Sequence, residues 1–208
     1  MKKGIAFRVF LFCLGMFSSA IGVSVITRTD LGTTPVSSFP YVASLLTGFS
    51  FGEATFVINC FFVLMQWVLL RRRFSPMRLL QVPAIFAFSV FLDLAMWLTA
   101  GLVAEGYAAR VLSIVPGAAL VGIGVSLQLH SDVTLLPGDG FVQAVSSVLD
   151  RPFGTVKVVN DVSFVTLAAI LSFVFSGTVV GVREGTLISA LLVGNFARLI
   201  LRRFPLKE

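Results

Sequence analysis

Charged and amide side chains interrupt the otherwise apolar stretch of residues 155–176. Lys157, Asn160 and Asp161 lie within its first seven positions. In a helix, positions 157 and 161 share one face, one turn apart, so the ammonium and the carboxylate can pair. Ionisable groups are expensive in an apolar environment and usually face protein, a solute or an ion there. The cluster therefore indicates a polar site, although Lys157 is also near enough to the end of the stretch to extend its ammonium into water.

Two shorter segments, residues 35–47 and 137–149, carry further polar residues near their starts. Each opens with a proline, Pro35 or Pro137, as the first turn of a helix often does. Exposed backbone N–H groups at a helix start favour an anion, whereas an aspartate in the second segment favours a cation, so the sign of a ligand is open. Together with Lys157, Asn160 and Asp161, the candidate solute-binding residues are Asp30, Thr33, Thr34, Asn59, Asp132, Asp139 and Gln143.

Other kinds of chemistry have little support in the sequence. One histidine and two well-separated cysteines, Cys13 and Cys60, supply no convincing ligand set for a transition metal. No Walker loop, dinucleotide-binding glycine pattern or serine-histidine-aspartate arrangement occurs in a suitable context. We therefore expect no catalytic residues, no metal and no cofactor, and we do not expect an enzyme.

The composition is that of a membrane protein. Hydrophobic residues make up 57% of the 208 positions and charged residues 12%, and the mean hydropathy is +0.98. A soluble domain needs more polar surface than this. The apolar residues form blocks of about 20, the length of helix that crosses a hydrocarbon core. The expected fold is all-α, with six transmembrane helices over residues 6–27, 53–70, 79–101, 110–129, 155–176 and 184–201.

The two short segments do not fit this set of spans. A helix over residues 35–47 or 137–149 extends only about 20 Å, which is too short to cross the bilayer. Each is predicted to be either a re-entrant helix or an amphipathic helix that lies at the interface, and the sequence is compatible with both.

The net charge of +6 reflects membrane topology rather than a nucleic-acid partner. With the amino terminus in the cytoplasm, only Arg28, Arg110 and Arg183 fall on the outer side. An excess of Lys and Arg on the cytoplasmic side is the usual orientation signal, so both termini are predicted to be cytoplasmic. The residues on the inner side are Lys2, Lys3, Arg8, Arg71, Arg72, Arg73, Arg78, Arg151, Lys157, Arg198, Arg202, Arg203 and Lys207.

The sequence aligns on itself, without a gap, when it is shifted by 102 positions. Residues 21–24 match residues 123–126, and further matches pair Asp30 with Asp132, Pro35 with Pro137, Phe51 with Phe153 and Gly52 with Gly154. One membrane domain, residues 1–208, is therefore predicted to consist of two homologous halves, 1–102 and 103–208. Because each half has three spans, the second half is expected to be inverted in the bilayer.

The third and sixth spans hold one more pair of matched polar positions, Asp93 and Asn195. Arg198 follows Asn195 by about one turn. If these two spans pack together, Arg198 is within reach of the Asp93 carboxylate, and a buried ion pair between them would be structural as readily as functional.

Three motifs are similar to those of a known family. They are Asp30-Leu31-Gly32-Thr33-Thr34-Pro35, the pair Phe51-Gly52, and Gly181-Val182-Arg183-Glu184-Gly185-Thr186-Leu187-Ile188-Ser189-Ala190-Leu191. Over most of its length the chain resembles the YczE/YitT-like family of small bacterial membrane proteins. The resemblance implies a bacterial cytoplasmic (inner) membrane protein with glycine-rich helices, from a family without an established biochemical activity. The second half lacks a counterpart of Gly32, so the two turns need not be equivalent.

Two functions are compatible with these observations. The first is a multi-pass transporter or permease for an unknown small solute, because inverted repeats often bind substrate where the halves meet. It predicts that Asp139, Asn160 and Asp161 line one cavity. The second is a non-transporting accessory or scaffold protein that assists an enzyme or biosynthetic complex through a membrane or cytoplasmic protein partner. It predicts a packed bundle without a central cavity. The expected partners common to both are the lipids of the bilayer, with no nucleic acid.

Overall fold

The computed structural model describes residues 4–102 and 104–204, and within them the chain forms eight α-helices, two short 3-10 helices and no strand. The expected all-helical fold is confirmed. The elements are α1 (Ile5–Arg28), α2 (Pro35–Leu46), α3 (Phe51–Leu70), η1 (Arg71–Arg73), η2 (Pro76–Leu80), α4 (Gln81–Leu98), α5 (Tyr107–Ser131), α6 (Pro137–Leu149), α7 (Phe153–Ser176) and α8 (Glu184–Arg203).

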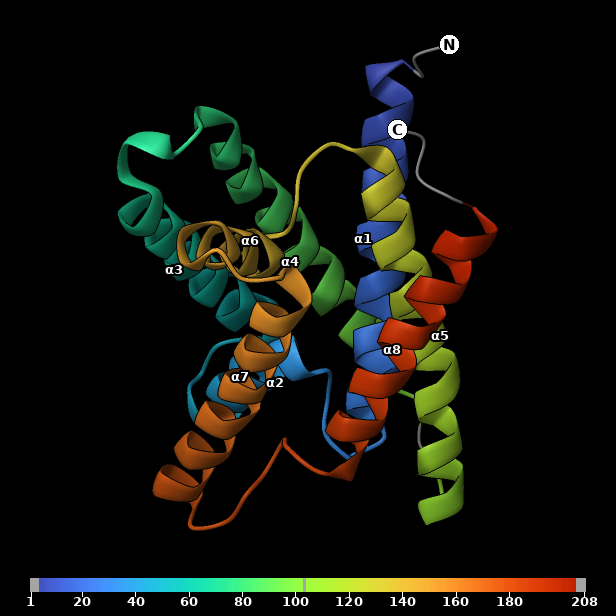
Figure 1. The fold of residues 1–208 in the computed structure, drawn as a ribbon. Coiled ribbons are helices and arrows are strands. Elements are labelled where there is room, and N and C mark those ends of the chain that lie inside the picture. The colour runs from blue at the N-terminus through green and yellow to red at the C-terminus, as the bar shows by residue number, and fades with distance from the viewer. Residues whose placement is uncertain (1–3, 103, 205–208) are drawn as a thin grey trace.

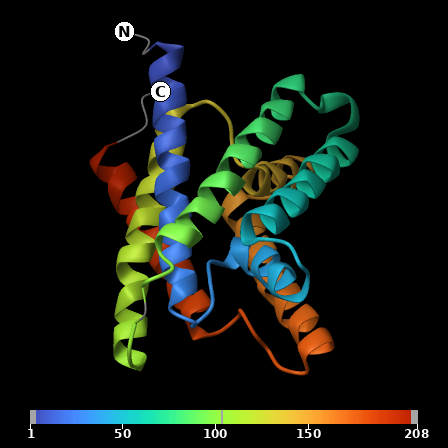
Figure 2. The same ribbon diagram turned by 180° about the vertical axis from the view of Figure 1, so that it is seen from behind.

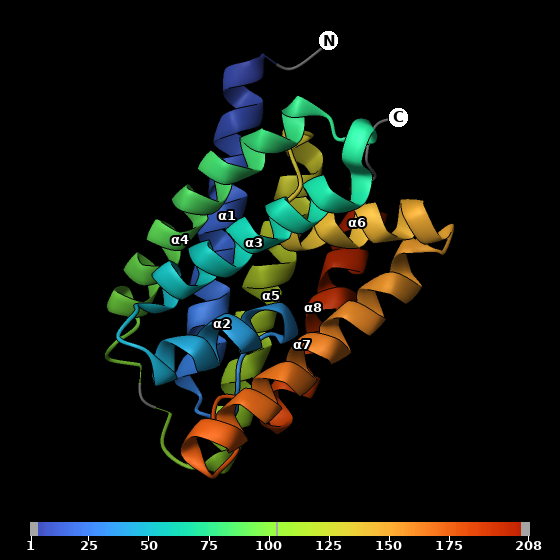
Figure 3. The same cartoon turned by 90° about the vertical axis from the view of Figure 1, so that its left-hand side faces the viewer.

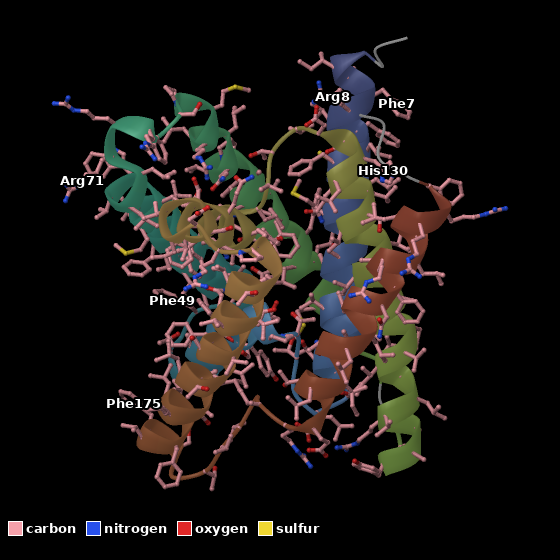
Figure 4. All side chains as sticks on the ribbon, in the orientation of Figure 1. Phe7, Arg8, Phe49, Arg71, His130 and Phe175 are labelled. Carbon is pink, nitrogen blue, oxygen red and sulfur yellow. The ribbon has the colours of Figure 1, made fainter. Side chains whose placement is uncertain are left out.

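Six helical segments are long and apolar enough to cross a membrane: α1, α3 with η1, η2 with α4, α5, α7 and α8. They coincide with the six predicted spans to within a few residues. Large apolar side chains cover their outer faces; Phe175, for example, is 70% exposed at the outer side of α7 (Figure 4). Such a surface suits lipid, so this is a multi-pass membrane protein.

The close contact of α1 with α5 is the centre of one helical layer. The two helices run antiparallel (Figure 1), and glycines bring their backbones together. A Cβ on Gly22 would lie 2.5 Å from the carbonyl oxygen of Gly117, and a Cβ on Gly15 would lie 2.7 Å from that of Gly124. Small residues permit such approaches in membranes. Helix α8 packs beside α5, and α4 packs beside α1 on the other side (Figure 2).

The short helices α2 and α6 lie across the long helices, in the layer formed with α3 and α7 (Figures 1 and 3). Both pack against α3 and α7. Each begins with its proline, as predicted. Thr34 occupies the N-cap position of α2, but its hydroxyl donates to Ser37 Oγ at 2.8 Å and accepts no backbone N–H. The two short helices are therefore positioned mainly by packing between α3 and α7.

The turn after α1 packs against the start of α8, far away in the sequence. The backbone N–H of Gly185 donates to the carbonyl of Leu31 at 2.8 Å. A Cβ on Gly185 would lie 2.6 Å from that oxygen, and the Thr186 hydroxyl occupies the place of a Cβ on Gly32. Gly32 also has a φ of +106°, which favours glycine. Two of the three family-like motifs thus form one structural unit.

Helices α3 and α4 pack tightly along each other, whereas α7 and α8 lie apart (Figure 1). Asp93 on α4 accepts hydrogen bonds from Ser50 Oγ at 2.6 Å and from the Gly52 N–H at 2.7 Å. The predicted Asp93–Arg198 pair is therefore wrong: α4 packs on α1 and α3, and the carboxylate is used at the start of α3. A Cβ on Gly52 would collide with the carbonyl oxygen of Ser89, but open space surrounds Gly154 on α7.

We predict that Gly22→Ala destabilises the protein, because its methyl group would force apart the backbones of α1 and α5. Overpacking of this kind costs about 1–3 kcal/mol. The matched control is Gly194→Ala in α8, where nothing lies within 4 Å of the added Cβ. Thermal unfolding in detergent should show a lower midpoint for Gly22→Ala and an unchanged or higher one for Gly194→Ala. Equal midpoints for Gly22→Ala and the wild type would contradict the close contact.

Candidate functional site

A cavity of about 510 Å³ lies between the two helical layers. All eight α-helices contribute to its lining, which is largely apolar. A cavity of this size is within the usual range for small-molecule sites. Its polar lining residues are Ser19, Thr34, Ser37, Thr55, Asn59, Gln128, Thr134, Asp139, Lys157, Asp161 and Arg198.

A cluster of three charges forms one wall of this cavity. The Nζ atom of Lys157 lies 3.1 Å from Oδ1 of Asp161, one turn further along α7, and 3.1 Å from Oδ1 of Asp139 on α6. The side chains are 26–39% exposed. The predicted pairing of Lys157 with Asp161 is confirmed, and Asp139 joins it. Because one ammonium serves two carboxylates, the cluster carries a formal charge of −1 and connects α6 to α7.

Asp139 reaches the cluster because the first turn of α6 is held against α3 and α4. Gln66 of α3 donates from Nε2 to the carbonyl of Pro137 at 3.2 Å and to Oε1 of Gln81 at 2.9 Å. A Cβ on Gly140 would lie 2.6 Å from Nε2 of Gln81. The absence of a side chain at position 140 therefore lets this turn approach the two glutamines.

Gln143, a candidate binding residue, belongs to this supporting network and does not line the cavity. Its Oε1 accepts from Nη2 of Arg78 at 3.1 Å, and Nη1 of Arg78 donates to Oε1 of Gln66 at 2.8 Å. Gln66 is fully buried. Buried amides that satisfy each other in this way stabilise one arrangement of their helices. Gln143 therefore helps to position α6.

Two other candidate residues line the cavity, and Asn160 does not. Asn59 is 7% exposed, and its Nδ2 donates to the carbonyl of Thr55 at 2.9 Å. Thr34 lies at the start of α2 beside the cavity. Asn160 stands one position before Asp161 and is absent from the cavity lining, and its side-chain amide interacts with the Asp161 carboxylate. Of the three residues expected to line one cavity, Asp139 and Asp161 do so and Asn160 does not.

The remaining candidates, Asp30, Asp132 and Thr33, lie outside the cavity. Asp132 pairs with Arg8 at 2.8 Å, and Asp30 pairs with Arg110 at 3.3 Å. Figure 4 shows Arg8 near the end of the bundle that also holds His130 of α5. The aspartates are 91% and 76% exposed, so each pair contributes at most about 1 kcal/mol. Buried Thr33 accepts a hydrogen bond from Thr27 Oγ1 at 2.8 Å.

Sequence reasoning gave too little weight to three residues of the cavity. Arg198 of α8 lines it and forms no hydrogen bond or ion pair with the residues that the structure describes. Gln128 of α5 donates to Ser19 Oγ at 3.1 Å. The sequence did hold a signal for two of these residues. Ser19 follows Gly15 by four residues and Gln128 follows Gly124 by four, so each lies on the helix face that forms the α1–α5 contact.

The comparisons with known proteins find a family and a relative without an assigned activity. A model of a family of unknown function (DUF6198) matches residues 6–202. The chain belongs to the DUF6198 family. The matched region contains every cavity residue named above. This DUF6198 member is also 26% identical, over 195 residues, to an uncharacterized protein of Haemophilus influenzae strain Rd, covering 93% of this chain and 82% of that protein. Neither match carries the YczE/YitT-like name, and no solved structure matches the chain.

We predict that Lys157→Met destabilises the protein by about 1–2 kcal/mol, because it leaves Asp139 and Asp161 as neighbouring carboxylates without a cation. Adding Asp139→Asn should recover part of this loss. The two single variants and the double variant form a thermodynamic cycle, measured by unfolding in detergent. Asp150→Asn, at an exposed position after α6, serves as the control. Strictly additive effects of Lys157→Met and Asp139→Asn would show that the two charges do not interact.

Proposed function

We propose that this DUF6198 member is a transporter or permease for a small solute in the bacterial cytoplasmic membrane. The observation that carries the proposal is the cavity of about 510 Å³ with Lys157 between Asp139 and Asp161 in its wall. Charged side chains within membrane helices are expensive and commonly mark the path of a solute or an ion. Here they face an open space large enough for a small solute.

The contacts of α1 with α5 support two inverted repeats. Gly15 meets Gly124 and Gly22 meets Gly117, and a shift of 102 positions exchanges these two contacts. The same shift exchanges the ion pairs Arg8–Asp132 and Arg110–Asp30. Helices α1 and α5, α2 and α6, and α3 and α7 also begin 102 positions apart. In transporters built from inverted repeats, the substrate site lies where the halves meet.

The short helices support a re-entrant placement over an interfacial one. The start of α2, at Thr34–Ser37, and the start of α6, at Leu136–Asp139, both contribute to the cavity lining. Both helices pack between α3 and α7. Helix starts that point into a central cavity are a recurrent device for binding solutes in transporters. A helix on the membrane surface would have no reason to reach such a cavity.

The accessory-protein hypothesis predicts a packed bundle, and the cavity is the feature that it does not explain. A link to the YczE/YitT-like family stays a hypothesis that rests on the three motifs. The absence of an enzymatic activity likewise stays a prediction.

The inverted arrangement predicts that matching loops lie on opposite sides of the membrane. We expect Ser75→Cys, between α3 and α4, to be labelled only from the cytoplasm, and Thr178→Cys, between α7 and α8, only from outside. Both positions are exposed. The measurement uses a membrane-impermeant thiol reagent on cells, in a chain whose Cys13 and Cys60 are replaced by alanine. Labelling of both loops from the same side would contradict the inversion.

If the protein is a transporter, a solute, soluble in water or in the membrane, should bind at the charged wall of the cavity. In a screen of small metabolites against the purified protein, a bound solute should raise the melting temperature. At a solute concentration of 100 times its Kd, the free energy of unfolding should increase by about 2.7 kcal/mol. Asp161→Asn should weaken this effect, and Asp150→Asn should leave it unchanged. A hit that stabilises Asp161→Asn as strongly as the wild type would contradict the proposed site. Transport of the hit is then measured in vesicles.

A further inference from the structure

Helices α7 and α8 both line the cavity but pack little against each other. On one side of the molecule, Gly52 lets α3 pack directly on α4 and Asp93 binds the start of α3. On the other side, α7 and α8 lie apart, and nothing lies within 4 Å of a Cβ on Gly154. Helices α7 and α8 are both long and apolar enough to cross a membrane, so we expect lipid to surround the gap between them.

The two edges of this opening are apolar. Val158 of α7 lines the cavity and is 62% exposed, and Ala190, Val193 and Gly194 of α8 line it from the other edge. A polar solute would gain nothing from such edges. An acyl chain could lie along them and continue into the bilayer, since the edges and the lipid tails are equally apolar.

Arg198 supplies the polar recognition at this opening. It lies on α8 one turn after Gly194, lines the cavity, and has no hydrogen-bond or ion-pair partner among residues 4–102 and 104–204. A guanidinium offers five donors in a planar fork that suits carboxylate and phosphate. Arg198 is exposed, so its guanidinium is open to an anion that reaches it from the cavity or from the gap between α7 and α8.

The other charges of the cavity leave this preference intact. Asp139 and Asp161 already share the ammonium of Lys157, at 3.1 Å each. The starts of α2 and α6 at the cavity wall carry the positive ends of their helix dipoles. The unsatisfied group of the site is therefore a donor that requires an acceptor anion.

Building on the proposed function, we infer that the cavity binds a membrane-resident amphiphile with a carboxylate or phosphate head group. The head group contacts Arg198, and the apolar chain leaves the cavity between α7 and α8 into the bilayer. This assigns Arg198 as the residue that selects the charge of the ligand, and the gap between α7 and α8 as the entrance.

The test uses the purified protein in phosphatidylcholine nanodiscs and follows its melting temperature. The probes are laurate and dodecyl phosphate, compared with acetate and inorganic phosphate, which share the head group but lack the chain, and with dodecyltrimethylammonium, which has the chain and the opposite charge. We expect only the two anionic amphiphiles to stabilise the wild type. Arg198→Gln should weaken their apparent affinity at least tenfold, and Arg198→Lys less. Arg202→Gln, one turn later on α8 and outside the cavity lining, should bind as the wild type does.

Each alternative outcome overturns a stated part of the inference. Equal, Arg198-dependent stabilisation by acetate or phosphate would mean that the ligand is a soluble anion and that the opening between α7 and α8 plays no part. Stabilisation by dodecyltrimethylammonium would overturn the assigned charge. Anionic amphiphiles that stabilise Arg198→Gln as strongly as Arg202→Gln would remove the role of Arg198.

The inference and the proposed function fail in different experiments. A water-soluble solute whose binding depends on Asp161 would support the transporter and overturn the amphiphile. An amphiphile that binds through Arg198 but stays in its own leaflet when the protein is reconstituted in vesicles would support the binding site and contradict transport.

Discussion

Hydrocarbon offers no hydrogen bonds, and this constraint governs how the polar residues of the chain are arranged. A polar side chain within a span has to find its partner in the protein. Asp93 satisfies two donors at the start of α3, and the amides of Gln66 and Gln81 satisfy each other and the carbonyl of Pro137. These hydrogen bonds hold helices together alongside close packing such as the glycine contact of α1 with α5, because burying apolar side chains drives little association where the solvent is itself apolar.

The same constraint separates supporting polar groups from those that remain available to a ligand. Gln66, Gln81 and Arg78 form hydrogen bonds that fix the first turn of α6. As a result, Asp139 points to the cavity. Lys157 is shared between two carboxylates. Among the charged residues that line the cavity, Arg198 alone has no ion-pair partner in the described part of the chain. The support and the site are thus built on the same short helix, so a change that loosens α6 would also displace the charged wall.

Most of the fold could be predicted from the sequence, because helix length and hydrophobicity respond to bilayer thickness and not to distant contacts. The pairing of Lys157 with Asp161 was also predictable, since both residues lie on one turn of one helix. The recruitment of Asp139 was not, because it depends on α6 packing on α7. Asp30 and Gln143 have the right chemistry for a site, but long-range contacts assign one to an exposed ion pair and the other to the support of α6.

The glycine contact between α1 and α5 has a consequence for the lengths of these helices. The two glycines of each helix are seven residues apart: Gly15 and Gly22 in α1, and Gly117 and Gly124 in α5. That spacing is about two turns, so both glycines of a helix face the same neighbour. One residue inserted between them would rotate the second glycine by about 100° and carry a side chain into the crossing. Insertions and deletions are therefore excluded from these two intervals, whereas the loops that join the helices are free to vary in length.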